Sequence, residues 1–285
     1  MKNHQLWIPF IGYFILTSGI IIWKGATHLF FAERGLSILV FIGIFILQKG
    51  LKPFLLPRHF QLFSVLSLYA ALTVLYKETA TLNLLFRPEI DPWLIHLDHL
   101  LFGFQPAERF SEVFPMAWFS ELMFFGYFWY YLMPLWVLYW VYTKIPDKIA
   151  SFGFHLLSSF LLYYFIFILV PAVGPQFYFE SPQNEIASQG IFGDTIKLIQ
   201  KNGEAPTAAF PSSHVGISWI VLIWVWKNLK NQWLFLLPFI ILLMTATVYI
   251  KAHYAADVWA GCLSAIAVYA IINFSLKKLK NVYHH

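Results

Sequence analysis

Three short polar sequences interrupt this apolar chain, and they contain residue types that can act as nucleophile, acid and base. They are Pro171-Ala-Val-Gly-Pro-Gln176, Phe210-Pro-Ser-Ser-His214 and His253-Tyr-Ala-Ala-Asp257. In a helix, His253 and Asp257 share a face because they lie four positions apart. The carboxylate can then accept the N–H of one ring nitrogen, which fixes the tautomer and leaves the other nitrogen free as a nucleophile or base.

The second of these sequences has the features of a helix start that binds an anion. Backbone N–H groups at a helix start are unpaired and the helix dipole is positive there, which favours a phosphate. Ser212 and Ser213 add hydroxyl donors, and His214 can give a proton to a leaving oxygen. Each feature also has an ordinary structural interpretation, because Pro-Ser-Ser is a common helix start and a single interfacial histidine is often structural.

The composition predicts that these residues lie in a membrane protein. Hydrophobic residues make up 59% of the chain and charged residues only 12%, whereas a typical soluble domain has about 25% charged residues. The apolar residues form runs long enough to cross a bilayer as helices. We therefore predict an all-α, polytopic transmembrane bundle of about eight spans. Their expected ranges are 7–23, 35–48, 60–76, 118–142, 149–171, 212–226, 233–250 and 255–274.

The chain is expected to divide into four parts. These are N-terminal transmembrane helices (1–76), an extracytoplasmic and interfacial connection (77–117), a catalytic transmembrane core (118–275) and a basic cytoplasmic tail (276–285). Within the connection, residues 93–102 are expected to form a short helix that lies in the membrane interface. Residues 172–210 are expected to form a partly ordered cap.

The basic residues predict which side of the membrane faces the cytoplasm. An even number of spans places both termini on one side, together with 11 of the 19 Lys and Arg residues but only one acidic residue, Asp147. The 11 are Lys2, Lys49, Lys52, Arg58, Lys144, Lys148, Lys227, Lys230, Lys277, Lys278 and Lys280. The termini are therefore predicted to be cytoplasmic, with the polar sequences at the extracytoplasmic face of the cell membrane. Basic residues gathered in short loops also argue against nucleic-acid binding.

The polar sequences resemble the motifs of a known family. Pro211-Ser-Ser-His214, followed by His253-x-x-x-Asp257 and a small-residue helix, is similar to two motifs of the type-2 phosphatidic acid phosphatase (PAP2) superfamily. Gly174-Pro175 and the stretch Asp98-His-Leu-Leu-Phe-Gly103-Phe-Gln-Pro106 resemble the inositolphosphotransferase-like and sphingomyelin-synthase-like branch of that superfamily. The resemblance covers roughly residues 90–270.

The resemblance implies a lipid phosphatase or phosphotransferase that works through a phosphohistidine. His253 would attack phosphorus, Asp257 would orient it, and His214 would protonate the departing alcohol and then activate the acceptor. Ser212 and Ser213 would hold the phosphoryl oxygens. The substrate would be a lipid phosphate in the bilayer; water as acceptor gives a phosphatase, and an alcohol gives a phosphotransferase. No cofactor or metal is expected.

The chain departs from the family pattern in its cations. The first motif ends at Gln176 without a basic residue, and Thr247 stands where well-known members have an arginine six residues before the nucleophile. Lys251 either supplies the missing charge or is an interfacial lysine, and Gln176 is a further candidate for phosphate binding. Fewer cations fit a phosphodiester-like reaction, another way of holding phosphate, or weak activity.

Two other classes of function stay open. His214, His253 and Asp257 could bind a metal in a membrane hydrolase, although the chain has no His-Glu-x-x-His sequence. The chain could also be a non-catalytic lipid-binding or transport protein on a PAP2-like scaffold, although transporters often place polar groups near the middle of the membrane. The identity of the lipid and the oligomeric state do not follow from the sequence.

Overall fold

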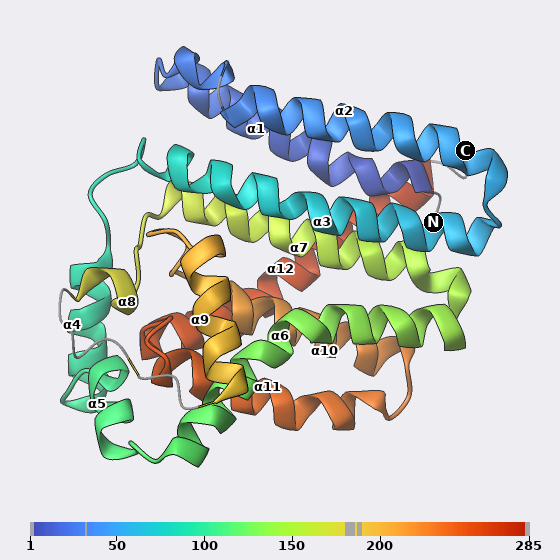
Figure 1. The fold of residues 1–285 in the computed structure, drawn as a ribbon. Coiled ribbons are helices and arrows are strands. Elements are labelled where there is room, and N and C mark those ends of the chain that lie inside the picture. The colour runs from blue at the N-terminus through green and yellow to red at the C-terminus, as the bar shows by residue number, and fades with distance from the viewer. Residues whose placement is uncertain (1–2, 32, 180–185, 187–189, 283–285) are drawn as a thin grey trace.

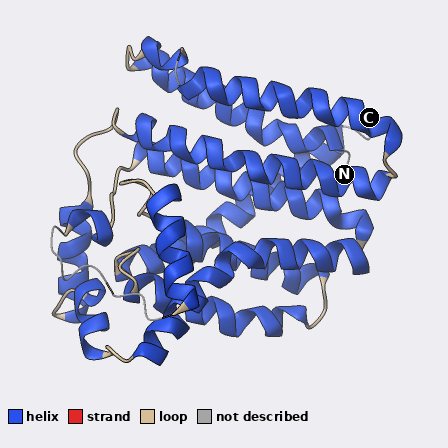
Figure 2. Cartoon of the chain, viewed as in Figure 1, coloured by secondary structure: helices blue, strands red, loops and turns tan. Residues whose placement is uncertain are grey.

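A computed structural model shows an all-helical protein (Figure 1, Figure 2). It describes residues 3–31, 33–179, 186 and 190–282. Helix makes up 83% of the structure, with no strand in the described part, and this confirms the predicted fold class. The helices are α1 (Ile8–Trp23), α2 (Glu33–Leu51), α3 (Pro57–Asn83), α4 (Asp91–Phe102), α5 (Pro106–Val113), α6 (Ala117–Lys144), α7 (Ile149–Leu169), α8 (Pro175–Tyr178), α9 (Ile191–Gly203), α10 (Ser213–Asn228), α11 (Gln232–Tyr249) and α12 (Ala255–Val282).

The long helices correspond closely to the predicted spans. Seven of the helices in the described residues, some counted with an adjoining 3-10 turn, are long and apolar enough to cross a membrane: α1, α2, α3, α6, α7, α11 and α12. The eighth predicted span is α10, which has 16 residues and is therefore only about 24 Å long at 1.5 Å per residue. α3 continues to Asn83 and α12 to Val282, beyond the expected ends of their spans at residues 76 and 274.

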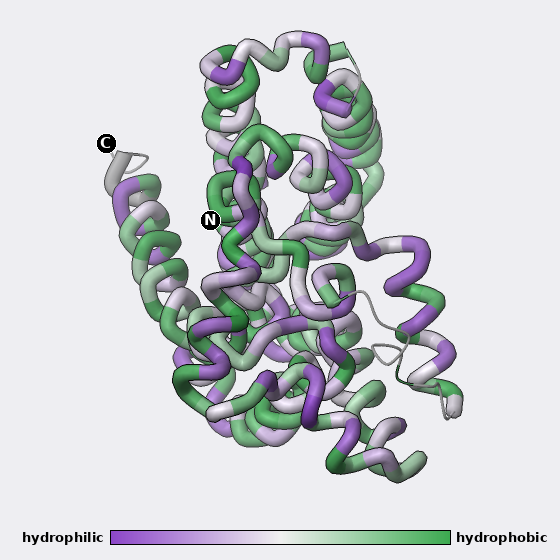
Figure 3. The backbone as a smooth tube through the Cα atoms, turned by 90° about the vertical axis from the view of Figure 1, so that its left-hand side faces the viewer, coloured by the Kyte–Doolittle hydropathy of each residue, from purple (hydrophilic) through white to green (hydrophobic). Residues whose placement is uncertain are grey.

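The short helices gather at one end of the bundle. In Figure 1, α4, α5, α8 and α9 lie at the left-hand end, whereas the start of α1 and the end of α12 lie at the right. Figure 3 views the molecule from the left-hand end, where hydrophilic and hydrophobic residues alternate along the connecting segments. The predicted interfacial helix is α4, which has Pro92 in its first turn and ends at Gly103 in the left-handed conformation.

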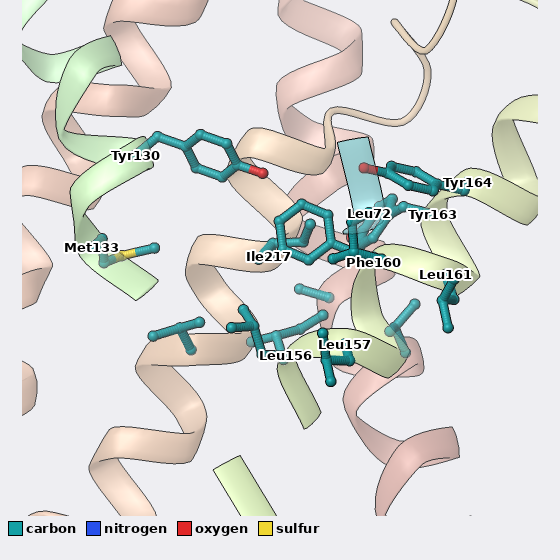
Figure 4. Close-up of a cluster of buried hydrophobic side chains, with 14 of the residues drawn as sticks. Leu72, Tyr130, Met133, Leu156, Leu157, Phe160, Leu161, Tyr163, Tyr164 and Ile217 are labelled. Carbon is teal, nitrogen blue, oxygen red and sulfur yellow. The ribbon is translucent and has the colours of Figure 1, made fainter. Parts of the chain in front are cut away.

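α7 is the central helix of the bundle, and its neighbours pack on all its sides. Most of its residues are buried, which explains why it is apolar around its whole circumference. Figure 4 shows side chains of α7, including Leu157 and Phe160, among Leu72 of α3, Met133 of α6 and Ile217 of α10. This core fixes the positions of the helices that carry the polar motifs.

Two glycines allow α10 to approach its neighbours closely. A side chain at Gly216 would collide with the ring of Tyr163 on α7. A Cβ atom at Gly261 of α12 would lie 2.7 Å from the backbone oxygen of Ser212 at the start of α10. The absence of a side chain at these positions therefore brings the second and third polar motifs together.

The N-terminal helices are joined by a buried ion pair. Arg34 of α2 lies 2.7 Å from Glu78 of α3, and both side chains are almost wholly buried. Arg34 also donates to the hydroxyl of Thr17 on α1 at 2.6 Å, and the hydroxyl of Ser37 donates to Glu78 at 3.4 Å. Charges inside a membrane protein are costly unless they are paired, so this cluster links α1, α2 and α3 specifically.

Candidate active site

The two histidines of the polar motifs face each other at the end of the bundle that carries the short helices. His214 lies in the first turn of α10, and His253 lies in the connection just before α12. Nδ1 of His214 and Nε2 of His253 are 3.1 Å apart, which is a hydrogen-bond distance. The two motifs therefore meet at the same end of the bundle, as the alternating direction of successive spans predicts.

The surroundings of His253 fix its tautomer. Its Nδ1 atom lies 2.9 Å from the backbone carbonyl oxygen of Ala209 and 3.5 Å from Oδ2 of Asp257. A carbonyl oxygen can only accept a hydrogen bond, so Nδ1 carries the hydrogen. Nε2 then keeps its lone pair and accepts the hydrogen of His214 Nδ1. The carbonyl of Ala209 lies nearer to His253 than the carboxylate of Asp257 does, and the orienting role of Asp257 stays a prediction.

Asp257 ties the third motif to the second. It is fully buried, and its Oδ2 atom accepts from the backbone N–H of Tyr254 at 2.9 Å. Its backbone carbonyl accepts from the N–H of Ser212 at 3.1 Å. Its Oδ1 atom has no hydrogen-bond partner among the described residues. Among all residues that the structure describes, no group of three or more His, Cys, Asp or Glu side chains is placed to hold a metal ion.

A carboxylate of α4 supports the start of α12, a role that the sequence did not reveal. Asp98 accepts from the backbone N–H groups of Ala255 and Ala256 at 3.0 and 2.8 Å. It thereby satisfies unpaired donors at a helix start directly after His253. Burial raises the pKa of Asp98, and the hydrogen bonds from the two backbone N–H groups oppose that rise.

A second carboxylate of α4 holds the first motif. Asp91 accepts from the backbone N–H groups of Val173 and Gly174 at 2.9 and 2.8 Å and from the hydroxyl of Tyr254 at 3.0 Å. Burial and the neighbouring Asp91 charge raise the pKa of Tyr254, so its hydroxyl stays a donor. The available sequence signal was the spacing: Asp91 and Asp98 are seven positions apart, which places them on one face of a helix.

A cavity of about 410 Å³ adjoins both histidines. Six tyrosines line it: Tyr69 and Tyr76 from α3, Tyr127, Tyr130 and Tyr131 from α6, and Tyr164 from α7. Figure 4 shows the hydroxyl ends of Tyr130 and Tyr164 pointing toward the same space. Ala70 and Thr73 also line the cavity, and both are exposed on the outer side of α3. The cavity therefore extends from the histidines to the flank of the bundle.

An acidic residue that the sequence analysis did not select also lines this cavity. Glu204, directly after α9, accepts hydrogen bonds from the hydroxyl of Tyr127 at 2.8 Å and from the side-chain amide of Gln176. The ring of Tyr127 in turn packs on His214, with 4.8 Å between the ring centroids. Only one side chain therefore separates this carboxylate from the histidine pair.

The comparison with known families decides which family the chain belongs to. The model of the PAP2 superfamily matches residues 92–271, more than half of the 285 residues. The chain belongs to the PAP2 superfamily. The chain therefore has a fold of the phosphatase and phosphotransferase type. Its long apolar helices indicate a membrane protein. No curated protein and no solved structure matches the chain.

The PAP2 region forms only part of the cavity wall. His214, His253, Tyr127 and Glu204 lie within the matched residues 92–271. The wall that α3 contributes precedes this region in the chain. The N-terminal helices therefore do more than anchor the PAP2 region, because one of them completes the space beside the histidines.

The two serines predicted to bind phosphate have different surroundings. The hydroxyl oxygen of Ser212 accepts from the backbone N–H of Val215 at 3.4 Å, so it caps α10. Ser213 lines the cavity together with His214. Phosphate binding by either serine stays a prediction, and Ser213 has the more direct access.

The other two predicted phosphate ligands lie in polar surroundings of their own. Gln176 lines the cavity, but its amide donates to Glu204 and its side-chain oxygen accepts from Gln200 at 3.0 Å. Lys251 is buried and is not among the described residues that line the cavity. Burial lowers the pKa of Lys251, and the charges of Glu108 and Glu112 oppose this effect. Their roles as phosphate ligands also stay predictions.

Proposed function

We propose that the chain is an integral-membrane enzyme that cleaves or transfers the phosphate group of a lipid through a phosphohistidine at His253. The observation that carries this proposal is the distance of 3.1 Å between His253 Nε2, which has a lone pair, and His214 Nδ1, which has a hydrogen. Displacement at phosphorus proceeds in line, with the nucleophile and the leaving oxygen on opposite sides. A phosphoryl group that enters between the rings, which must separate to admit it, meets both groups.

The reaction would have two steps. In the first, Nε2 of His253 forms a bond to phosphorus, the ester P–O bond breaks, and the leaving oxygen takes the hydrogen of His214 Nδ1. In the second, His214 removes a proton from water or an alcohol, whose oxygen bonds to phosphorus while the P–N bond breaks. The hydrogen bond from His253 Nδ1 to the carbonyl of Ala209 favours these two steps because it leaves Nε2 unprotonated.

A lipid substrate suits the shape of the cavity. The exposed Ala70 and Thr73 on the flank of α3 allow an acyl or prenyl chain to stay in the bilayer. The phosphate would then approach the histidines from the end of the bundle, which the distribution of basic residues predicts to be the extracytoplasmic face of the cell membrane. The resemblance to the inositolphosphotransferase-like and sphingomyelin-synthase-like branch supports an alcohol as one possible acceptor, besides water.

Replacement of the nucleophile tests the proposal. We expect His253→Ala to lower the release of diacylglycerol from a panel of vesicle-bound phospholipids by at least about 1,000-fold, because the covalent step is lost. The matched control is His96→Ala, which removes an exposed histidine of α4 at the same end of the bundle. A radiolabelled phosphoryl donor should give an acid-labile phosphoenzyme with the native chain and with the control, but not with His253→Ala.

Three outcomes would contradict the proposal. Full turnover by His253→Ala would exclude the covalent step. Saturable lipid binding without turnover by the native chain would favour a lipid-binding or transport protein on the PAP2 scaffold. Loss of turnover on treatment with a chelator, with recovery on addition of one divalent metal, would favour a metallohydrolase built from His214, His253 and Asp257.

A further inference from the structure

The cavity beside the histidines contains a carboxylate, which is unusual for a site that must accept a phosphate. Among the described residues that line the cavity, Glu204 is the one acidic side chain and Lys77 the one Lys or Arg. Lys77 is exposed, whereas Glu204 is partly buried. A substrate with two negative charges on its phosphate would meet one exposed cation and one fixed anion in the same space.

The position of Glu204 is well defined by its neighbours. Its two oxygens accept separately, one from the hydroxyl of Tyr127 and one from the amide of Gln176. Gln176 is held in turn by Gln200 of α9. A carboxylate has about four lone-pair positions, so Glu204 can still accept further hydrogen bonds from a ligand in the cavity.

We propose that Glu204 is a specificity-determining residue, which makes the site select phosphodiester lipids whose headgroup carries hydrogen-bond donors. A phosphodiester has one negative charge, against up to two on a phosphomonoester, so the repulsion by Glu204 is smaller. A hydroxyl or ammonium group on the headgroup can donate to the free lone pairs of Glu204. This inference rests on the proposed function, because it concerns the substrate of the same two histidines.

The reaction of such a lipid follows the two proposed steps. His253 Nε2 bonds to phosphorus, the bond from phosphorus to the diacylglycerol oxygen breaks, and that oxygen takes the proton of His214 Nδ1. The headgroup stays on phosphorus, attached to His253 and close to Glu204. Water or an alcohol then displaces His253, which gives a phosphorylated headgroup or a new phosphodiester. Diacylglycerol is released from every donor lipid, so one product measures them all.

The test compares four donors in vesicles of otherwise identical composition. Phosphatidic acid is the monoester, phosphatidylglycerol offers hydroxyl donors, phosphatidylethanolamine offers an ammonium donor, and phosphatidylcholine is a diester without a donor. We expect the native chain to use phosphatidylglycerol, phosphatidylethanolamine or both with a higher kcat/KM than phosphatidic acid or phosphatidylcholine. The favoured lipid then shows whether hydroxyl or ammonium groups are recognised.

The variant Glu204→Gln keeps the shape and an acceptor for Tyr127 but removes the charge. We expect it to shift the ratio of kcat/KM values toward phosphatidic acid by about tenfold, the scale for one charge acting within a partly buried site. A purely structural role would lower the rates for all donors equally. The matched control is Asp147→Asn, which removes an exposed carboxylate at the opposite end of the bundle and should leave the ratio unchanged.

The possible failures can be told apart. A native preference for phosphatidic acid, equal use of phosphatidylcholine, or an unchanged ratio in Glu204→Gln would overturn the role of Glu204 while leaving the proposed function in place. Absence of turnover with every donor would overturn both. The rates of His253→Ala, measured in the same vesicles, identify which part of the turnover depends on the proposed nucleophile.

Discussion

The two sides of the cavity are held in different ways. On the histidine side, within the PAP2 region, backbone groups make the decisive contacts: Ala209 binds His253, Ser212 binds Asp257, and Asp98 binds the start of α12. On the α3 side, apolar packing and a buried cluster around the Arg34–Glu78 ion pair hold the wall. The contacts on the first side act directly on the histidine loop and the start of α12, whereas those on the second side lie among the N-terminal helices.

This difference leads us to expect separable effects of substitution. Changes of the reacting groups on the histidine side should alter the chemical step. Changes on the α3 side should alter assembly of the bundle or access of the lipid, with the chemistry of each folded molecule retained.

After replacement of the nucleophile, the largest effect is expected for the proposed acid. His214→Ala should lower kcat for a natural phospholipid by about 100- to 10,000-fold, the range for general acid–base catalysis. A nitrophenyl phosphodiester needs no proton on its leaving oxygen, so the release of nitrophenol in the first turnover should be affected much less, whereas later turnovers still need His214 as the base. An equal loss of the first-turnover rate with both substrates, measured by rapid mixing, would contradict the role of His214 as the acid.

On the other side of the comparison, Arg34→Met should mainly affect stability. It leaves Glu78 charged and buried without its partner, which typically costs about 3–5 kcal/mol. Thermal unfolding in detergent should show this loss, and the double variant with Glu78→Met should recover most of it. The rate per folded molecule should stay close to that of the native chain; a large fall in that rate would show that the N-terminal helices affect the chemical step.

A smaller effect is expected where α3 lines the cavity. Thr73→Trp adds bulk where α3 lines the cavity and should raise KM for long-chain lipids about tenfold, with little change for a short-chain soluble analogue. Leu66→Trp is the matched control, because Leu66 is exposed on the same helix but is not among the lining residues described. Equal changes in both variants would argue against lipid access along this side.

The smallest effect concerns the pH dependence of stability. The pKa of Asp98 is raised above 3.8 in the folded protein. As pH rises from 3.8 through the raised value, the unfolded chain loses its proton first, so Asp98 contributes progressively less stability. Asp98→Asn should lack this component, which is about 1.4 kcal/mol for each tenfold difference in proton affinity between the folded and unfolded chains. Unfolding curves of both proteins at several pH values should show a stability difference that falls as pH rises.

The sequence predicted the features that depend on local pattern. Apolar runs located the spans to within a few residues, except at the ends of α3 and α12, and the alternating direction of successive spans placed His214 and His253 at one end of the bundle. The approach of these residues to hydrogen-bond distance also required Gly216 and Gly261, whose packing partners cannot be identified from spacing alone.

The features that the sequence did not reveal depend on contacts between distant segments. Asp98 and Ala255 are 157 positions apart, and Glu204 meets Tyr127 across 77 positions. Their residue types are ordinary for a short surface helix and for the end of a helix. Only the packed bundle shows that Asp98 supports the start of α12 beside His253 and that Glu204 lines the cavity.

The two carboxylates of α4 also have a consequence for the order of assembly in the cell. The ribosome completes Asp91 and Asp98 long before it reaches Tyr254, Ala255 and Ala256, which donate to them in the finished protein. Domains synthesised at the N-terminal end generally fold first, but α4 must wait for α12 before its two carboxylates gain these donors. The histidine pair is therefore completed only after the start of α12 has been made, and a chain cut before α12 lacks Asp257 and the backbone groups of Ala255 and Ala256.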